Sequence, residues 1–198
     1  ISACLVGSEM CIRDRLNIAE LTPSVFSGTI TDANVSNGAT LAITQSGGAS
    51  LTLSGSNSYS GLTTVSAGSL IASNNFALGN ADSITSGLVM NPSAGTAIVD
   101  FTSANPTIGS LASNGAGTSD VVLGNIAGTG SATTLNVGAS GNAGVFNGVI
   151  SDQVSSEPGA IGSLNLDGGS LTLNGADTFT GVTTISAGTV SYTHLRAH

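Results

Sequence analysis

The chain has 198 residues, a formal net charge of −8 and 28 glycines, and only 7% of its residues are charged and 4% aromatic. Charged residues make up about 25% of a usual globular domain. Because the chain has just 3 lysines and arginines, nothing in it neutralises a phosphate backbone, and nucleic acid is excluded as a partner. No apolar run is long enough for a transmembrane helix, and 40% hydrophobic residues are too many for simple disorder. The length and composition therefore predict a single β-rich domain.

The two ends of the chain differ in composition from everything between them. Residues 190–198 read VSYTHLRAH, and a DNA sequence that encodes them has a reverse complement encoding VGSEMCIRD, which is residues 6–14. This shared DNA resembles the adapter and mosaic end of transposase-based sequencing libraries. We therefore predict that residues 1–15 and 190–198 are adapter-derived and non-native, and that 16–189 is the native domain.

This prediction removes most of the side-chain chemistry from the chain. Residues 16–188 contain no lysine, arginine, histidine or cysteine. They therefore lack the base of a Ser-His-Asp triad, a lysine-activated serine, a nucleophilic cysteine, a zinc ligand and a disulfide. Their charge comes from acids that are spread singly along the sequence: Glu20, Asp32, Asp82, Asp100, Asp120, Asp152, Glu157, Asp167 and Asp177.

Two kinds of site can be built from acids alone. Glycoside hydrolysis needs two carboxylates about 5 to 10 Å apart, and the nearest pair in the sequence is Asp152 and Glu157. Calcium needs several carboxylates and carbonyls, and Asp167-Gly168-Gly169 is a weak match to such a turn. We expect turn caps and solvated surface charges instead. We therefore predict no catalytic, cofactor-binding or metal-binding site. The chain is not expected to be an enzyme.

An internal repeat with an offset of 120 residues organises the native part. The segment SLTLSGSNSYSGLTTVSAGS at 50–69 aligns without gaps with SLTLNGADTFTGVTTISAGT at 170–189. The same offset aligns VFSGTITD, which ends at Asp32, with VFNGVISD, which ends at Asp152. The units thus cover about 25–69 and 145–189. Such a unit is too long for one coil of a β-solenoid but fits several coils of about 20 to 25 residues.

Short strands separated by glycine, serine and asparagine follow one another along the native part. Apolar and polar residues alternate in several of them, as in a half-buried strand, and Gly55 and Gly68 mark corners. A single helical turn is expected at 74–79. The pattern predicts an all-β solenoid, with a β-sandwich as the alternative. The expected strands are 51–53, 63–65, 70–71, 87–90, 97–101, 120–123 and 134–137.

The two aligned segments resemble the autotransporter-associated β-strand repeat. Its pattern runs Leu-Thr-Leu-x-Gly-x-Asn-x-Tyr-x-Gly-x-Thr-x-Ile/Val, followed by Gly and Leu. The second copy departs from it at Asp177, and Leu62 and Val182 stand where the family often has glycine. The residues that match are Gly55, Asn57, Tyr59, Gly61, Thr63, Val65, Gly68 and Leu70 in the first copy, and Gly175, Phe179, Gly181, Thr183, Ile185 and Gly188 in the second.

The resemblance implies a passenger segment of a type V secreted bacterial autotransporter, folded as a right-handed parallel β-helix. The implied role is a structural stalk that aids export and surface display, in a protein that is secreted or held at the cell surface and anchored in the outer membrane. The implied partners are the protein's own C-terminal outer-membrane β-barrel, expected to be absent from this chain, and host or matrix surface ligands of an adhesin. The alternatives are a ligand-binding adhesive module in its own right and a polysaccharide-degrading β-helix enzyme fragment.

Two pairs of equivalent positions in the repeat carry side chains suited to surface contacts. At Tyr59 and Phe179, corner packing or stacking is expected rather than ligand binding. The pairs Thr63-Thr64 and Thr183-Thr184 are expected on the strand surface, where flat threonine rows could contact carbohydrate.

Overall fold

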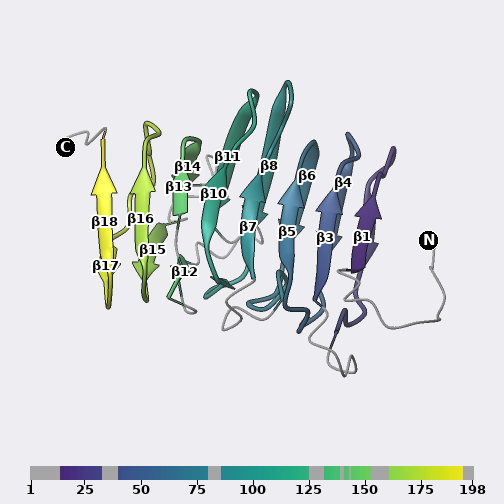
Figure 1. Ribbon diagram of the computed structural model, residues 1–198, viewed down its shortest axis with the longest axis horizontal. Coiled ribbons are helices and arrows are strands. Elements are labelled where there is room, and N and C mark those ends of the chain that lie inside the picture. The colour runs from purple at the N-terminus through teal and green to yellow at the C-terminus, as the bar shows by residue number, and fades with distance from the viewer. Residues whose placement is uncertain are drawn as a thin grey trace.

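The computed structural model describes residues 14–32, 40–79, 86–124, 132–138, 141–142, 144–152 and 161–193. These residues form short strands that stack side by side along one axis, with the N-terminus at one end and the C-terminus at the other (Figure 1). The strands are β1 (Asp14–Ile18), β2 (Ser24–Phe26), β3 (Leu41–Gln45), β4 (Ser50–Leu53), β5 (Leu62–Val65), β6 (Gly68–Ala72), β7 (Gly87–Met90), β8 (Thr96–Phe101), β9 (Thr107–Ile108), β10 (Leu111–Ser113), β11 (Thr118–Leu123), β12 (Thr133–Val137), β13 (Gly144–Phe146), β14 (Val149–Asp152), β15 (Gly162–Leu166), β16 (Ser170–Leu173), β17 (Thr183–Ile185) and β18 (Thr189–Tyr192).

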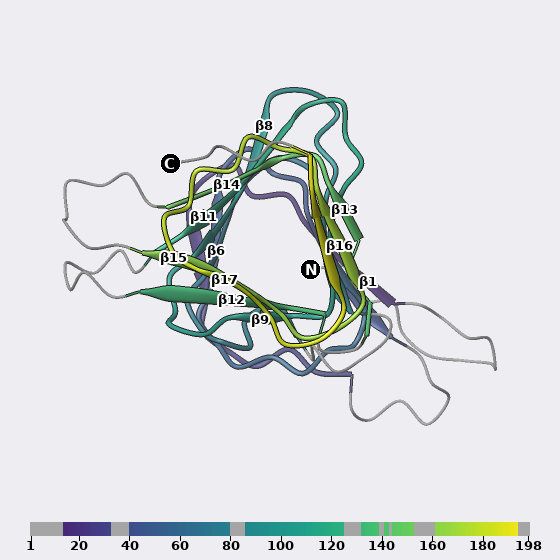
Figure 2. The ribbon, with the colours of Figure 1, turned by 90° about the vertical axis from the view of Figure 1, so that its left-hand side faces the viewer.

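The strands line three faces of a solenoid with a triangular cross-section (Figure 2). The first face has the order β1-β3-β5-β7-β10 and continues as β13-β16-β18, because β10 packs against β13. The second face is β2-β4-β6-β8-β11-β14, and the third contains β9-β12-β15-β17. Every strand pair within the described part is parallel. The solenoid prediction is confirmed, and the sandwich alternative, which needs antiparallel sheets, is wrong.

The chain winds through the first, second and third faces in that order. Seen from the C-terminal end, this path runs anticlockwise as it approaches the viewer, so the solenoid is right-handed (Figure 2). No helix occurs among the described residues, and therefore none that could cross a membrane. At 74–79 the structure has a turn rather than a helical turn, with Ala77 N–H bonded to Asn74 O.

The length of a coil varies more than the sequence indicated. Residues in register on adjacent coils are 19 positions apart at Leu51 and Leu70 but 29 apart at Leu135 and Leu164. The parallel ladder requires only that the strands keep their register, and connections at the corners absorb the extra residues. The expected 20 to 25 residues therefore describe the shorter coils alone.

The core is a set of apolar rows that run along the axis. On the second face one row consists of Leu51, Leu70, Val99, Val121 and Ile150, which are in register on successive strands and are all buried. Alternate residues of each strand point inward, so each apolar side chain stacks on one of the next coil. Burial of such a side chain contributes about 1.5 to 3 kcal/mol.

The end coils extend into the segments predicted to be adapter-derived. Strand β1 begins at Asp14, and β18 places Val190 in register with Leu171 and Tyr192 with Leu173. A terminal coil offers free backbone N–H and C=O groups that pair with any segment of suitable alternation. This pairing is thus independent of where the end residues come from, and their origin stays a prediction.

Candidate functional site

The conserved spacing of the two repeat copies brings one aspartate in each to a junction between coils. Asp32 Oδ2 accepts hydrogen bonds from Ser60 N at 2.8 Å, Ser60 Oγ at 2.6 Å and Leu41 N at 3.0 Å. Burial raises the pKa of Asp32, but these hydrogen bonds outweigh it, and the net pKa is lowered. One carboxylate thus joins the end of its own coil to the start of the next strand and to the following coil.

The second copy repeats this junction. Asp152 Oδ2 accepts a hydrogen bond from Thr180 N at 2.7 Å and another from Thr180 Oγ1, and Asp152 Oδ1 accepts one from Gly162 N at 2.6 Å. Turn caps or solvated surface charges were expected at these acids, but Asp32 and Asp152 instead bond to the start of the next strand and to the following coil. Glu157, the other member of the candidate carboxylate pair, lies outside the described residues, as does Asp82.

Asn57 connects three successive coils in the first copy. Its buried amide accepts a hydrogen bond from Ile30 N at 2.8 Å and donates one to Ala77 O at 2.7 Å, and its own N–H donates to Phe76 O at 3.0 Å. An amide has both an acceptor and a donor, so it satisfies a coil on each side. Asparagine supplies the acceptor and the donor at once.

Asp177 stands at the equivalent position of the second copy and makes half of these contacts. Its Oδ1 accepts a hydrogen bond from Ile150 N at 2.8 Å, as Asn57 does from Ile30. Its Oδ2 is buried and has no hydrogen-bond partner within the described part of the chain. Burial raises the pKa of Asp177, and the bond from Ile150 N–H opposes that rise in part.

The aromatic position of the repeat belongs to the core. Tyr59 is fully buried, and its hydroxyl lies 2.6 Å from Thr63 Oγ1. Burial raises the pKa of Tyr59 far above its ordinary value, so the phenol is neutral. Phe179 is partly buried and packs against the core, which confirms packing at both positions.

The structure corrects the expected placement of one threonine. Thr63 was expected on the strand surface with Thr64, but it is fully buried and faces Tyr59. The spacing Tyr-x-Gly-x-Thr is the sequence signal for this pair. In the second copy phenylalanine replaces tyrosine, and Thr183 Oγ1 instead lies 2.8 Å from the Tyr192 hydroxyl.

Glycines of the repeat allow backbones of adjacent coils to touch. A Cβ on Gly55 would lie within 3.0 Å of the carbonyl of Gly28, and a Cβ on Gly175 would meet the carbonyl of Gly148 in the same way. Gly68 has a φ of 67°, a left-handed conformation that glycine adopts without strain. Glycines shared by the two copies therefore serve close contacts between coils.

The two copies lie on different faces of the solenoid. Strand β4 of the first copy belongs to the second face, whereas the equivalent β16 pairs with β13 and β18 on the first face. Likewise β5 lies on the first face, and its equivalent β17 on the third. The offset of 120 residues thus corresponds to a whole number of coils less one face. Equivalent outward side chains point in different directions, while the hydrogen bonds that Asp32 and Asp152 accept from the following coil occur in both copies.

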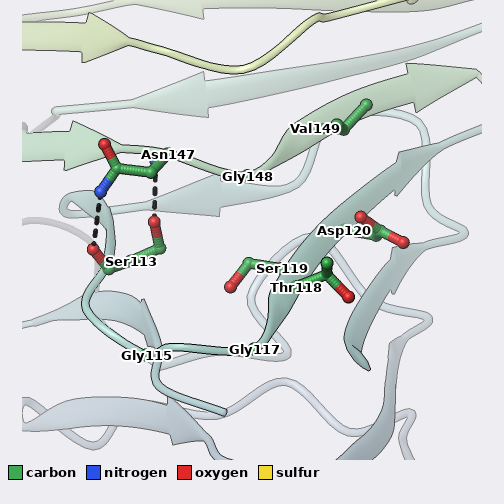
Figure 3. A pocket seen from close by; sticks show the side chains of 9 residues that line it. All are labelled: Ser113, Gly115, Gly117, Thr118, Ser119, Asp120, Asn147, Gly148 and Val149. Carbon is green, nitrogen blue, oxygen red and sulfur yellow. Dashed lines mark hydrogen bonds between the residues drawn. The ribbon is translucent and has the colours of Figure 1, made fainter. Parts of the chain in front are cut away.

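A notch of about 150 Å³ lies at the corner between the first and second faces. Ser113 Oγ accepts a hydrogen bond from Asn147 N at 2.8 Å, and Asn147 Nδ2 donates to Ser113 O at 3.2 Å (Figure 3). The corner at 114–117 is longer than the corner at 147–148 in the next coil, and the step between them leaves the hollow. The lining is Ser113, Gly115, Gly117, Thr118, Ser119, Asp120, Asn147, Gly148 and Val149.

The notch is small and is lined by few groups that could bind or react with a ligand. Its volume is below the roughly 300 to 1,000 Å³ of a typical small-molecule site. Asp120 is its single titratable group, and burial raises the pKa of this carboxyl. Acid–base hydrolysis of a glycoside needs a second carboxylate, which the lining lacks.

The remaining acids do not converge among the described residues. No group of three or more His, Cys, Asp and Glu side chains lies together there. Asp167 accepts a hydrogen bond from Asn165 Nδ2 at 2.8 Å at the end of β15, next to Gly168 and Gly169. Asp167 therefore makes a local polar contact at the end of a strand.

Asp100 is expected to make stability depend on pH. It lies on β8 between Ile71 and Val122 on the neighbouring strands, and its Oδ1 is buried and has no partner within the described residues. Burial raises its pKa to about 6. The folded chain binds this proton more tightly than the unfolded chain does. The contribution of Asp100 to the free energy of unfolding is therefore complete below about pH 4 and is lost as the pH rises through about 6. Allowing for partial solvent screening, the loss is about 1 to 2 kcal/mol.

Asp100→Asn tests this expectation. We expect the variant to match the wild type at pH 4 and to exceed it in unfolding free energy by about 1 to 2 kcal/mol at pH 7, measured by urea unfolding followed by circular dichroism. Asp167→Asn, which changes an exposed acid, serves as the control. Parallel pH curves for Asp100→Asn and wild type would contradict the assignment.

Comparison with known proteins identifies the repeat itself. A family model, the passenger-associated transport repeat, matches residues 43–72 and 166–191. The comparisons with curated proteins and with solved structures found no match. The two matched segments contain the asparagine or aspartate, aromatic, glycine and threonine positions whose contacts between coils are described above.

Proposed function

We propose that this chain is a structural stalk that aids export and surface display. The proposal starts from an autotransporter passenger segment with two passenger-associated transport repeats on a β-solenoid. Its fold would form outside the cell, one coil on the next. The full-length protein would be held at the cell surface through its own C-terminal outer-membrane β-barrel. We further propose that the segment is not catalytic and that it displays an adhesin that contacts host or matrix ligands.

The single observation that carries the stalk proposal is the placement of the two copies on different faces. Two contacts between coils occur in both copies: Asn57 and Asp177 each accept a hydrogen bond from the coil before, and Asp32 and Asp152 each accept hydrogen bonds from the coil after. A ligand-binding role for the repeat would require equivalent side chains on a shared surface. A role in joining coils is independent of the face, and this supports coil docking as the purpose of the repeat.

The spacing of the contacts supports folding during export. Each strand pairs with strands whose register partners are 19 to 29 residues away, as at Leu51 with Leu70 and Leu135 with Leu164. A coil can therefore dock as soon as it emerges, because the neighbouring coil has emerged just before it. Docking of successive coils would oppose backward sliding through the pore.

The test is a secretion assay. Residues 16–189 are placed between a signal peptide and an autotransporter translocator, and the appearance of the passenger at the surface is followed by protease accessibility over time. A passenger with Gly61→Ala, which disrupts a contact between coils, is expected to appear several-fold more slowly than wild type. A passenger with Gly48→Ala, whose added methyl would have nothing within 4 Å, should match the wild type. If passengers whose unfolding free energies differ in urea unfolding all reach the surface at the same rate, the export role is refuted.

A further inference from the structure

A second hollow lies at the corner between the second and third faces, where three successive coils pass. It is a shallow hollow of about 420 Å³ that is largely open to solvent. The contributing segments follow β4, β6 and β8. We call this hollow the Phe76 cup, and its lining is Ser56, Ser73, Asn74, Asn75, Phe76 and Ser103. All six residues lie in the part of the chain predicted to be native.

Phe76 is held in an exposed position by a rigid backbone. Its side chain is 51% exposed, although the next two residues, Ala77 and Leu78, are buried. Its N–H donates to Asn74 Oδ1 at 2.9 Å, and its carbonyl accepts from Asn57 N at 3.0 Å. The turn therefore presents a large apolar ring to solvent while its smaller neighbours fill the core.

The two asparagines beside the ring are oriented by the protein. Asn74 Oδ1 accepts from Phe76 N, and Asn75 Oδ1 accepts from Asn105 N at 3.0 Å. Because each oxygen faces a backbone N–H, the orientation of both amides is fixed. Within the described residues neither Nδ2 group has an acceptor, so both are donors for another molecule.

The exposed hydroxyls of the lining add neutral hydrogen-bonding capacity, whereas the hydroxyl of Ser103 is shielded from solvent. Ser103 Oγ is buried and has no partner within the described part. Ser56 and Ser73 are exposed at the rim. The lining contains no charged side chain, and the chain as a whole is strongly acidic, which disfavours an anionic ligand.

We propose that the Phe76 cup binds a neutral hexose-type carbohydrate. A pyranose ring has an apolar C–H face and a rim of hydroxyls. The Phe76 ring matches the apolar face, and the amide donors of Asn74 and Asn75 match the rim. A purely apolar ligand would cover the Nδ2 groups of Asn74 and Asn75 without giving them an acceptor. This proposal goes beyond the stalk role and does not depend on it.

The experiment is titration of the whole 198-residue chain with neutral hexasaccharides of glucose, mannose, galactose and N-acetylglucosamine. Oligogalacturonate serves as the anionic counterpart. Binding is followed by calorimetry and by the side-chain amide signals of Asn74 and Asn75 in nitrogen-edited spectra. We expect saturable binding of at least one neutral oligosaccharide, with those amide signals shifting, and at least tenfold weaker binding of oligogalacturonate.

Variants of the ring localise the binding. Phe76→Ala and Phe76→Leu are expected to weaken it at least tenfold, and Phe76→Tyr, which keeps the flat ring, to retain it. Phe26→Ala removes another exposed aromatic, in the first coil, and should bind like the wild type. Circular dichroism verifies that each variant is folded, and Phe76→Leu keeps an apolar side chain if Phe76→Ala does not fold. No saturable binding of any neutral oligosaccharide, equal binding by Phe76→Leu, or preference for oligogalacturonate overturns the proposal.

Discussion

Replacing Gly61 by alanine is expected to destabilise the solenoid by about 3 kcal/mol, because overpacking against backbone cannot be relieved by side-chain movement. Gly61 is buried immediately before β5, and its N–H donates to Leu41 O at 3.0 Å. A Cβ there would lie within 3.0 Å of the carbonyl of Leu41 and of Ala42 N. The two coils would have to separate, and the hydrogen bond would lengthen with them.

The measurement is urea unfolding followed by circular dichroism. Gly48→Ala is the matched control, since a Cβ on Gly48 would have nothing within 4 Å and its φ is not left-handed. Its effect should stay within about 0.5 kcal/mol. Similar unfolding curves for the two variants would show that close approach at Gly61 is not needed for stability.

Replacing Asn57 by alanine is expected to cost about 4 kcal/mol, because two buried backbone groups lose their partners at about 1 to 3 kcal/mol each and a cavity opens. The groups are Ile30 N–H and Ala77 C=O, on the coils before and after Asn57. The loss should appear as a lower urea midpoint and as faster hydrogen exchange at Ile30. Asn114→Ala, at an exposed position, is the control and should be nearly neutral.

Asn57→Asp separates the acceptor from the donor at this position. It keeps an oxygen for Ile30 N but places the other oxygen against Ala77 O, where Nδ2 now donates at 2.7 Å. That carboxyl must keep its proton, so its folded pKa is raised, and stability falls as the pH rises above the ordinary aspartate value near 4. A variant whose stability does not change between pH 4 and 7 would contradict this account. At the natural Asp177 the pKa is raised by burial, and Oδ2 has no partner among the described residues.

The strands that local sequence predicted are present in the structure, but β3, β10 and β15 were not among them, and the details of packing were not predicted. The expected strands 87–90 and 97–101 agree with β7 and β8 within one residue, because apolar alternation between glycine and serine corners leaves few other conformations. Thr63 was placed on the wrong side of its strand. Alternation through Val65 puts Thr63 inward with it, and its hydroxyl is accommodated there by the Tyr59 hydroxyl, a partner that composition does not reveal.

The sequence by itself determined the solenoid class, the repeat and the absence of base, thiol and cation chemistry between residues 16 and 188. These follow from residue identity and periodicity, which are local properties. Only the tertiary structure decided which face each copy occupies, since that depends on the summed lengths of corners between the copies and not on either copy. It also decided that Asn57 bonds to Ile30 and Ala77, and that Phe76 stands exposed beside Asn74 and Asn75. These are contacts between coils, fixed by a register that no single segment contains.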